Sequence, residues 1–491
     1  MIGVLRDNPI LVMCARSRLR RQHVVPFVTV ILVLCAFIAL SVAMSSGRPA
    51  DRALSFFRWF ATLQGAVLLL LGTARVGAAT SQVSQSGMLD FHRVSPLSAR
   101  SQAVGFVLGA PIREYLGFAI ILPLTLVAGC VSQVGLLAVL GVCGLTLLSS
   151  WVFHTLAAVL GLFAGPGARR VGTGGGVGFA VVACLLAPAA YFGTALPGLL
   201  TPIPGSSALL IDAAGGWPEG ELPASFPQPP TFFGLPLPLY FQSLIYQVPV
   251  LAFLSVALVR RLRSDGVHLF SRPVACLLLG TVATLALGGV IGRERATTTQ
   301  LGAVSAVVLG MAWLLVFVVT PTAGAHAGGL RRAARRGQER EPAMADAAVN
   351  WRPVACFAGI VAAVAVGAEG VGQGASGLSR AASTGLSVLW FGWALQGYAL
   401  LYRGRAVPYF MLLLFGLCAV PLLLAILLAS ADLDRLANVA VAVCPFGAGF
   451  QPDPMAIIVH AGLALWFGLR LRTDELDAVG RCRDATVVQT T

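Results

Sequence analysis

The chain has 491 residues, of which 57% are hydrophobic and only 11% charged, and its mean hydropathy is +0.84. These values lie outside the range of soluble domains and predict a polytopic membrane protein. The net charge of +14 would suggest a nucleic-acid partner in a soluble chain. Here most arginines occupy short segments between apolar runs, where they orient membrane spans, so we expect no nucleic-acid partner.

The sequence contains no lysine, and all 34 basic residues are therefore arginine. A Walker A motif needs lysine, and the glycine-rich run from Val171 to Gly178 lacks it, which predicts a flexible turn there. The ten cysteines are scattered, and neither a metal-spaced cluster nor a catalytic triad stands out. We expect no catalytic residue, cofactor or metal in this chain. If ATP drives it, another subunit must bind and hydrolyse the nucleotide.

The N-terminal residues 1–23 predict a cytoplasmic elbow helix that lies along the membrane surface. Asn8 is a favourable N-cap, and Pro9 is a favourable first-turn residue. The following residues mix apolar side chains with four arginines. Such a helix would anchor the topology of the chain and could also transmit the movement of a partner into the first span.

Twelve apolar runs approach the roughly 20 residues that a membrane-spanning helix needs. They cover residues 24–44, 56–79, 112–133, 136–163, 177–200, 240–262, 272–291, 299–322, 353–371, 383–402, 406–430 and 454–471. Arginines concentrate in alternate loops, which places both termini in the cytoplasm. The predicted fold is an all-α polytopic membrane protein with about 12 transmembrane helices.

The order of spans and polar segments repeats along the chain. This predicts two six-helix halves, at residues 24–266 and 267–480, followed by a cytoplasmic tail at 481–491. In each half a polar cytoplasmic segment follows the second span. The first of these segments covers residues 81–110.

Within that segment, Met88, Phe91 and Val94 recur three residues apart, which predicts a short amphipathic helix from Ser86 to Val94. Pro96 ends it, because the residue before a proline disfavours helical backbone. We expect Ser95 and Pro96 to form the N-cap and first turn of the next helix. Farther along, the small-xxx-small pair Gly105 and Gly109 predicts close approach of another helix.

The same segment resembles the membrane subunits of type-2 ATP-binding-cassette (ABC) exporters. The matching residues are Gly87, Leu89, Asp90, Phe91, Arg93, Pro96, Leu97, Ser98, Gly105, Gly109, Pro111, Glu114, Tyr115 and Pro123. The N-terminus is similar to that family at Asn8, Pro9, Ile10, Leu11, Arg16, Arg18 and Arg20. The chain departs from the family pattern where Gln82 or Ser84 replaces an acidic residue and Phe106 replaces a lysine.

The resemblance implies an exporter permease in the bacterial cytoplasmic (inner) membrane, powered by a separate cytoplasmic ATPase that binds ATP. It implies that a coupling helix docks on this ATPase through Gly87, Leu89, Asp90, Phe91, Arg93, Pro96, Leu97 and Ser98. One chain could form the whole pore, or it could pair with a second copy or a sister permease. The sequence does not identify the substrate.

A few ionisable residues in or beside the spans are candidates for the translocation path or its gate, because charges are costly in a membrane. They are Arg113, Glu114, His154, Glu369 and His460. For the histidines, hydrogen bonds to a neighbouring hydroxyl or carbonyl are the favoured alternative. The alternative for the adjacent Arg113 and Glu114 is an interfacial ion pair, and for Glu369 a loop-level or paired acid.

An ion- or proton-coupled secondary transporter with two six-helix repeats is the alternative function. It accounts for the repeated layout, but such carriers usually place acidic residues at the membrane midplane. The predicted spans contain no such Asp or Glu. The permease interpretation is therefore preferred.

Overall fold

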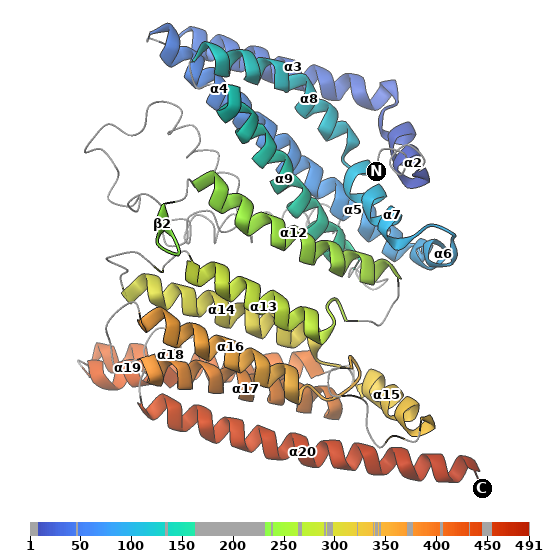
Figure 1. Cartoon of the computed structure of the whole chain (residues 1–491), viewed down its shortest axis with the longest axis vertical. Helices are drawn as coiled ribbons and strands as arrows, with labels where there is room; N and C mark the ends of the chain where they lie inside the picture. Colours follow the sequence, from blue (N-terminus) through green and yellow to red (C-terminus); the bar gives the residue numbers. More distant parts are fainter. Residues whose placement is uncertain are drawn as a thin grey trace. The chain divides into compact units, whose positions relative to one another are not determined.

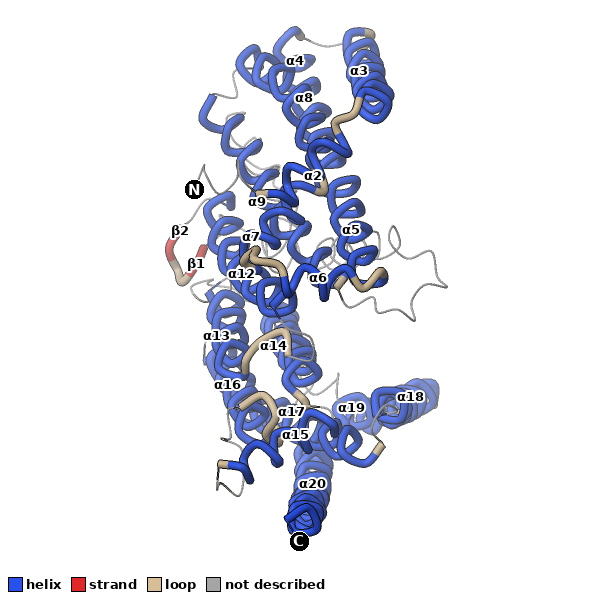
Figure 2. The backbone as a smooth tube through the Cα atoms, turned by 90° about the vertical axis from the view of Figure 1, so that its right-hand side faces the viewer, coloured by secondary structure: helices blue, strands red, loops and turns tan. Residues whose placement is uncertain are grey.

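The computed structural model is almost entirely helical in the residues that it describes (Figure 1). These are residues 8–45, 48–132, 136–162, 231–236, 239–263, 268–288, 291, 298–321, 323–336, 338, 342, 345–370, 377–402, 406–431, 433–443 and 454–490. The one β-structure in these ranges is a small hairpin of β1 (Thr231–Phe232) and β2 (Leu235–Pro236) (Figure 2). The chain forms two compact units: unit 1 is Met1–Pro230 with Pro236–Asp265, and unit 2 is Thr231–Leu235 with Gly266–Thr491.

Several helices are suited to a membrane. Within the described ranges, 6 are long and apolar enough to cross it, namely Arg21–Ala43, Pro49–Gln85, Ile112–Val131, Leu136–Gly161, Ser243–Arg263 and Leu412–Ser430. Shorter apolar helices cover Arg272–Gly288, Val307–Val319 and Trp351–Gly367. The chain is therefore a helical membrane protein. Helices overlap every predicted span in the described ranges, whereas the span predicted at 177–200 lies outside them. The count of twelve and the side of the termini stay predictions.

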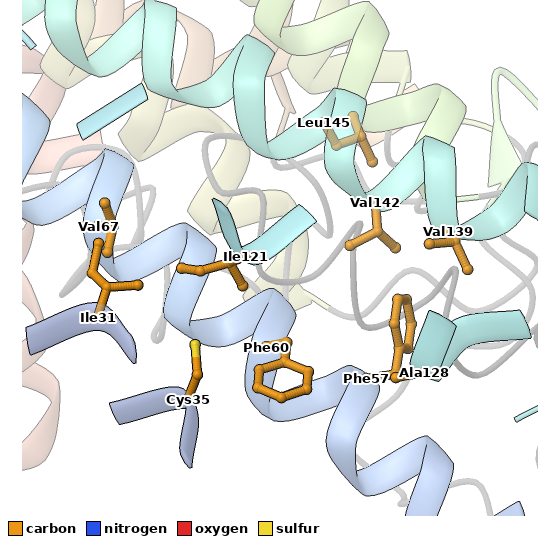
Figure 3. Close-up of a cluster of buried hydrophobic side chains, with 10 residues drawn as sticks. All are labelled: Ile31, Cys35, Phe57, Phe60, Val67, Ile121, Ala128, Val139, Val142 and Leu145. Atoms are coloured by element: carbon orange, nitrogen blue, oxygen red, sulfur yellow. The ribbon is translucent and has the colours of Figure 1, made fainter. Parts of the chain in front are cut away.

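Unit 1 begins with α2 (Pro9–Arg18), α3 (Arg21–Ala43), α4 (Pro49–Gly65), the π-helix η1 (Ala66–Gly72) and α5 (Thr73–Gln85). It continues with α6 (Met88–Val94), α7 (Ala99–Val104), the π-helix η2 (Gly105–Gly109), α8 (Ile112–Val131), α9 (Leu136–Gly161) and α12 (Leu239–Arg263). Its apolar core joins α3, α4, η1, α8 and α9 (Figure 3). The core residues are Ile31, Cys35, Phe57, Phe60, Val67, Ile121, Ala128, Val139, Val142 and Leu145.

Unit 2 contains α13 (Arg272–Gly288), α14 (Thr298–Val319), α15 (Ala323–Arg335) and α16 (Trp351–Gly370). Next come α17 (Gly377–Leu401), α18 (Ala406–Ser430), α19 (Asp434–Val443) and α20 (Pro454–Thr490), which extends through most of the predicted tail. Aromatic rings fill the interior: Phe391 stacks on Trp313 at 4.8 Å and meets Phe410 edge-on at 5.0 Å between centroids.

Helices at equivalent positions in the two units make equivalent contacts. Here α9 of unit 1 corresponds to α17 of unit 2, and α3 corresponds to α13. In unit 1, α9 contacts α5 and α12, while α3 contacts α4 and α8. In unit 2, α17 contacts α14 and α20, while α13 contacts α14 and α16. A shared order of packing is the pattern expected of an internal structural repeat.

The N-terminal helix α2 lies directly against η2. The predicted cap is confirmed, because the Asn8 side-chain oxygen accepts hydrogen bonds from the backbone N–H groups of Ile10 and Leu11. A Cβ at Gly105 would lie 2.7 Å from Cβ of Ile10, and one at Gly109 would lie 3.2 Å from Cβ of Cys14. The close helix approach predicted for this glycine pair is therefore confirmed, and the approaching helix is α2.

We predict that Gly105→Ala lowers the free energy of unfolding by about 1–3 kcal/mol, the usual cost of overpacking, and exposes Cys14. The thermal midpoint in detergent and the rate of Cys14 alkylation in an otherwise cysteine-free chain measure the two effects. Gly144→Ala in α9 is the matched control, because a Cβ there meets nothing within 4 Å. Equal midpoints and labelling rates for the two variants would contradict this packing.

Candidate functional site

The predicted amphipathic helix is α6, which begins at Met88 because Gly87 adopts the left-handed conformation, with φ of 75°. Leu89 is 5% exposed and fixes the helix to the rest of unit 1. Its apolar stripe faces outward: Met88, Phe91 and Val94 are 48%, 68% and 83% exposed. The sequence predicted this stripe, and the described part of the chain leaves it exposed.

Arg93 connects α6 to a distant helix. Its Nη1 lies 2.8 Å from Oδ1 of Asp90, and its Nη2 donates a hydrogen bond of 3.2 Å to the carbonyl oxygen of Arg261 in the last turn of α12. Asp90 is 78% exposed, whereas the side chain of Arg93 is only 11% exposed. Asp90 therefore orients an arginine whose charged group is shared with α12.

The bend between α6 and α7 differs from the prediction. Ser95 closes α6 by donating its hydroxyl to the carbonyl of His92, while Ser98 is the N-cap of α7 and accepts from the N–H of Ser101 at 3.1 Å. Pro96 and Leu97 lie in the connection between the helices. The prediction that Ser95 and Pro96 start the next helix is wrong, because the Ser95 hydroxyl is already used by α6.

Gln102 stabilises this bend, a role that was not predicted from the sequence. The side chain is 2% exposed, and its Nε2 donates to the carbonyls of His92 at 2.7 Å and Leu97 at 3.1 Å. Both carbonyls belong to residues where the helical ladder is interrupted. A glutamine in the first turn of the helix that follows a proline bend is the signal that could have identified it.

Glu114 is a buried carboxylate between two arginines. It is 1% exposed, and its Oε1 lies 3.0 Å from Nη2 of Arg113 and 3.9 Å from Nε of Arg75. The guanidinium of Arg113 also lies over the ring of Phe27, 4.5 Å from its centroid. The cluster therefore links α8 to α5 and α3 by charge and cation–π contacts.

His154 is fully buried in α9 and has partners at both ring nitrogens. Its Nε2 is 3.0 Å from the carbonyl oxygen of Leu68 in η1, and its Nδ1 is 3.1 Å from the hydroxyl of Tyr115 in α8. Because a carbonyl cannot donate, Nε2 carries the proton and the Tyr115 hydroxyl donates to Nδ1. A Cβ at Gly72 would lie 2.5 Å from Nε2, so this position requires glycine. The favoured alternative, a histidine satisfied by a hydroxyl and a carbonyl, is confirmed.

The other two candidates lie in unit 2. His460 is buried in α20, where its Nδ1 accepts a hydrogen bond of 3.0 Å from Nε1 of Trp390 and the two rings stack. Glu369 lies in the last turn of α16, and its side chain is outside the described part of the chain. No group of three or more His, Cys, Asp or Glu side chains in the described residues could hold a metal.

Unit 2 contains a polar cluster of its own, which was not predicted from the sequence. Arg272, at the start of α13, is fully buried and donates to the carbonyls of Ala348 and Val349, while His268 and His326 bind the carbonyls of Asp346 and Ala347. These four successive carbonyls immediately precede α16. The cluster fixes the backbone that leads into α16.

The predicted coupling residues thus lie together in unit 1, on α6 and its connection to α7, while Glu114 and His154 lie in α8 and α9 of the same unit. No protein-family model, no curated protein and no solved structure matches the chain. The interpretation of this site therefore depends on its own geometry.

We predict that Glu114→Gln destabilises unit 1 by about 2–3 kcal/mol, because it leaves two arginine charges without their buried counter-ion. Asp90→Asn removes the carboxylate of an exposed ion pair and should cost less than about 1 kcal/mol. Chemical unfolding of both variants in detergent measures the difference. If Glu114→Gln lowers the free energy of unfolding no more than Asp90→Asn does, the buried ion pair contributes little to stability.

We also predict that acid loosens α6. Burial lowers the pKa of His92 from its ordinary value of 6.5, so the folded chain favours the neutral ring, which meets Phe106 edge-on at 5.9 Å. The stability from this ring is present above pH 6.5 and is lost as the pH falls through the lowered pKa. Alkylation of the buried variant Leu89→Cys, in an otherwise cysteine-free chain, should therefore accelerate at pH 5.5 relative to a His92→Phe background. A constant ratio between the two backgrounds across pH would contradict this.

Proposed function

We propose that the chain is a permease subunit similar to those of type-2 ABC exporters, in the bacterial inner membrane, with α6 as the helix that docks on a separate ATPase. The ATPase binds and hydrolyses ATP, and this chain supplies the translocation pathway. It either forms the pore alone or pairs with a second copy or a sister permease.

One observation carries the proposal: α6 is firmly attached but presents an uncovered apolar stripe. Leu89 and Arg93 fix it to unit 1, whereas Met88, Phe91 and Val94 are exposed. Helices that dock in a groove use apolar residues at this spacing as anchors. Asp90, which is 78% exposed on the same short helix, would add a polar contact at the rim of such a groove.

The attachment of α6 also suits the transmission of movement. It follows the continuous helix Pro49–Gln85, whose 37 residues span about 55 Å, well beyond the roughly 30 Å of a bilayer core. Arg93 connects α6 to the end of α12, and Gln102 connects it to α7. Displacement of α6 by a partner would therefore be passed to several spans as a rigid-body movement.

The alternative without a protein partner is that the apolar stripe of α6 lies in the lipid headgroup region. The secondary-transporter alternative gains no support from His154, because both of its ring nitrogens have structural partners. An ATPase encoded beside this gene would favour the permease interpretation.

We predict that the double change Met88→Ser and Phe91→Ser weakens association with that ATPase at least tenfold, because it removes two exposed anchors of the size found at interface hot spots. Co-purification of the full-length chain with the ATPase, followed by titration in nanodiscs, measures the effect. The thermal midpoint of the permease alone should stay unchanged, since both side chains are exposed.

Met44→Ser is the control, because Met44 is 79% exposed at the end of α3. Unchanged ATPase association in the double variant would contradict docking through α6. Equal weakening by Met44→Ser would indicate a general effect of surface polarity. A further outcome is that the double variant still associates with the ATPase while an isolated α6 peptide with the same two changes no longer partitions into membranes. That result would favour the headgroup alternative.

A further inference from the structure

A cavity of about 240 Å³ lies between α17, α18 and α20 in unit 2. Its wall is rich in aromatic side chains, including Trp393, Tyr398, Tyr402, Trp466 and Phe467, and it also includes Arg470. The volume is slightly below the roughly 300–1,000 Å³ of pockets that enclose a whole small molecule. It therefore suits one part of a larger ligand.

Packed aromatic rings form the α17 side of the cavity. Trp393 lies 5.0 Å from Trp351, and Tyr398 lies 5.3 Å from Tyr402, measured between ring centroids. Gly397 leaves room in the wall, since the nearest atom to a Cβ there, Oδ2 of Asp474, would be 3.9 Å away. The space is thus set on this side by packed rings and by a missing side chain.

The surroundings of the cavity are apolar and exposed. On α20, Trp466 is 64% exposed, and on α18, Leu412 and Phe415 are 68% and 69% exposed. The part of α18 from Leu412 to Ser430 is long and apolar enough to cross a membrane. Exposed apolar side chains on such a helix face lipid acyl chains. A ligand of this cavity could therefore enter from the membrane.

Arg470 is the residue that would make a charged contact with a ligand of this cavity. It is the charged residue among the described lining residues, and it follows Trp466 by one helical turn, at the end of the predicted span 454–471. At the end of a span, a guanidinium would meet the phosphate level of the bilayer, where it can form bidentate hydrogen bonds. Tryptophan and tyrosine also favour this level, because their rings are apolar and their N–H and O–H groups are polar.

We propose that this cavity binds a membrane phospholipid, with its phosphate on Arg470 and its glycerol and first acyl carbons against the aromatic wall. The site is independent of α6 and of any ATPase, so it holds whether or not the proposed function is correct. It would keep one lipid bound while neighbouring lipids exchange.

Native mass spectrometry of the full-length chain, released from detergent with added lipid, tests the site. Phosphatidylglycerol and phosphatidylethanolamine should both bind, and Arg470→Gln should weaken each roughly tenfold, the effect of losing a charge-assisted hydrogen bond. Arg472→Gln is the matched control, since Arg472 is exposed on the same helix and is not among the described lining residues. Gly397→Phe should also weaken binding by filling the cavity, with gel filtration confirming that the variant folds.

Equal weakening by Arg470→Gln and Arg472→Gln would overturn the proposal, because it would indicate general attraction between arginines and lipid. Competition by inorganic phosphate at concentrations equal to the lipid would also overturn it, since the apolar wall would then add nothing. Diacylglycerol, which lacks phosphate, should bind weakly and equally to the wild type and Arg470→Gln. If Gly397→Phe does not fold, the two arginine variants still decide the outcome.

Discussion

The close approach of α2 to η2 is the contact on which one end of unit 1 depends. Glycine is required at 105, where a Cβ would overlap Ile10, and it relieves a tight contact with Cys14 at 109. Asn8 strengthens the contact by capping α2 and donating to the carbonyl of Ser101 at 2.7 Å. The N-terminal helix is therefore part of the folded unit at the same point where α7 leads into η2.

Buried polar side chains in both units bind backbone carbonyls. His154 binds Leu68, Gln102 binds His92, and Arg272 binds the segment before α16. A buried carbonyl outside the helical ladder is costly to leave unpaired, and these buried side chains supply the donors. Of the two buried histidines that the sequence offers as candidates, His154 thus binds a backbone carbonyl and a tyrosine hydroxyl, and His460 binds a tryptophan N–H.

Local features of the chain were predictable, while long-range partners were not. An asparagine before a proline is sufficient to predict the cap at Asn8, and glycine spacing predicted a close helix approach without identifying α2 as the helix. The choice between Ser95 and Ser98 as the cap of α7 depended on which hydroxyl was already used, and both residues suit the role. The buried arginine of α13 could not be predicted, since its carbonyl partners lie 76 and 77 residues away.

The second helix of unit 1 connects two packing groups. Its first part, α4, packs on α8, whereas its last part, α5, packs on α9, which in turn contacts α12. The π-helix η1 lies between them, and His154 binds its Leu68 carbonyl. π-Helical turns are common points of bending and function. Under the proposed function, a push on α6 would move α5, α9 and α12 together, and η1 is where that movement would separate from α4 and α8.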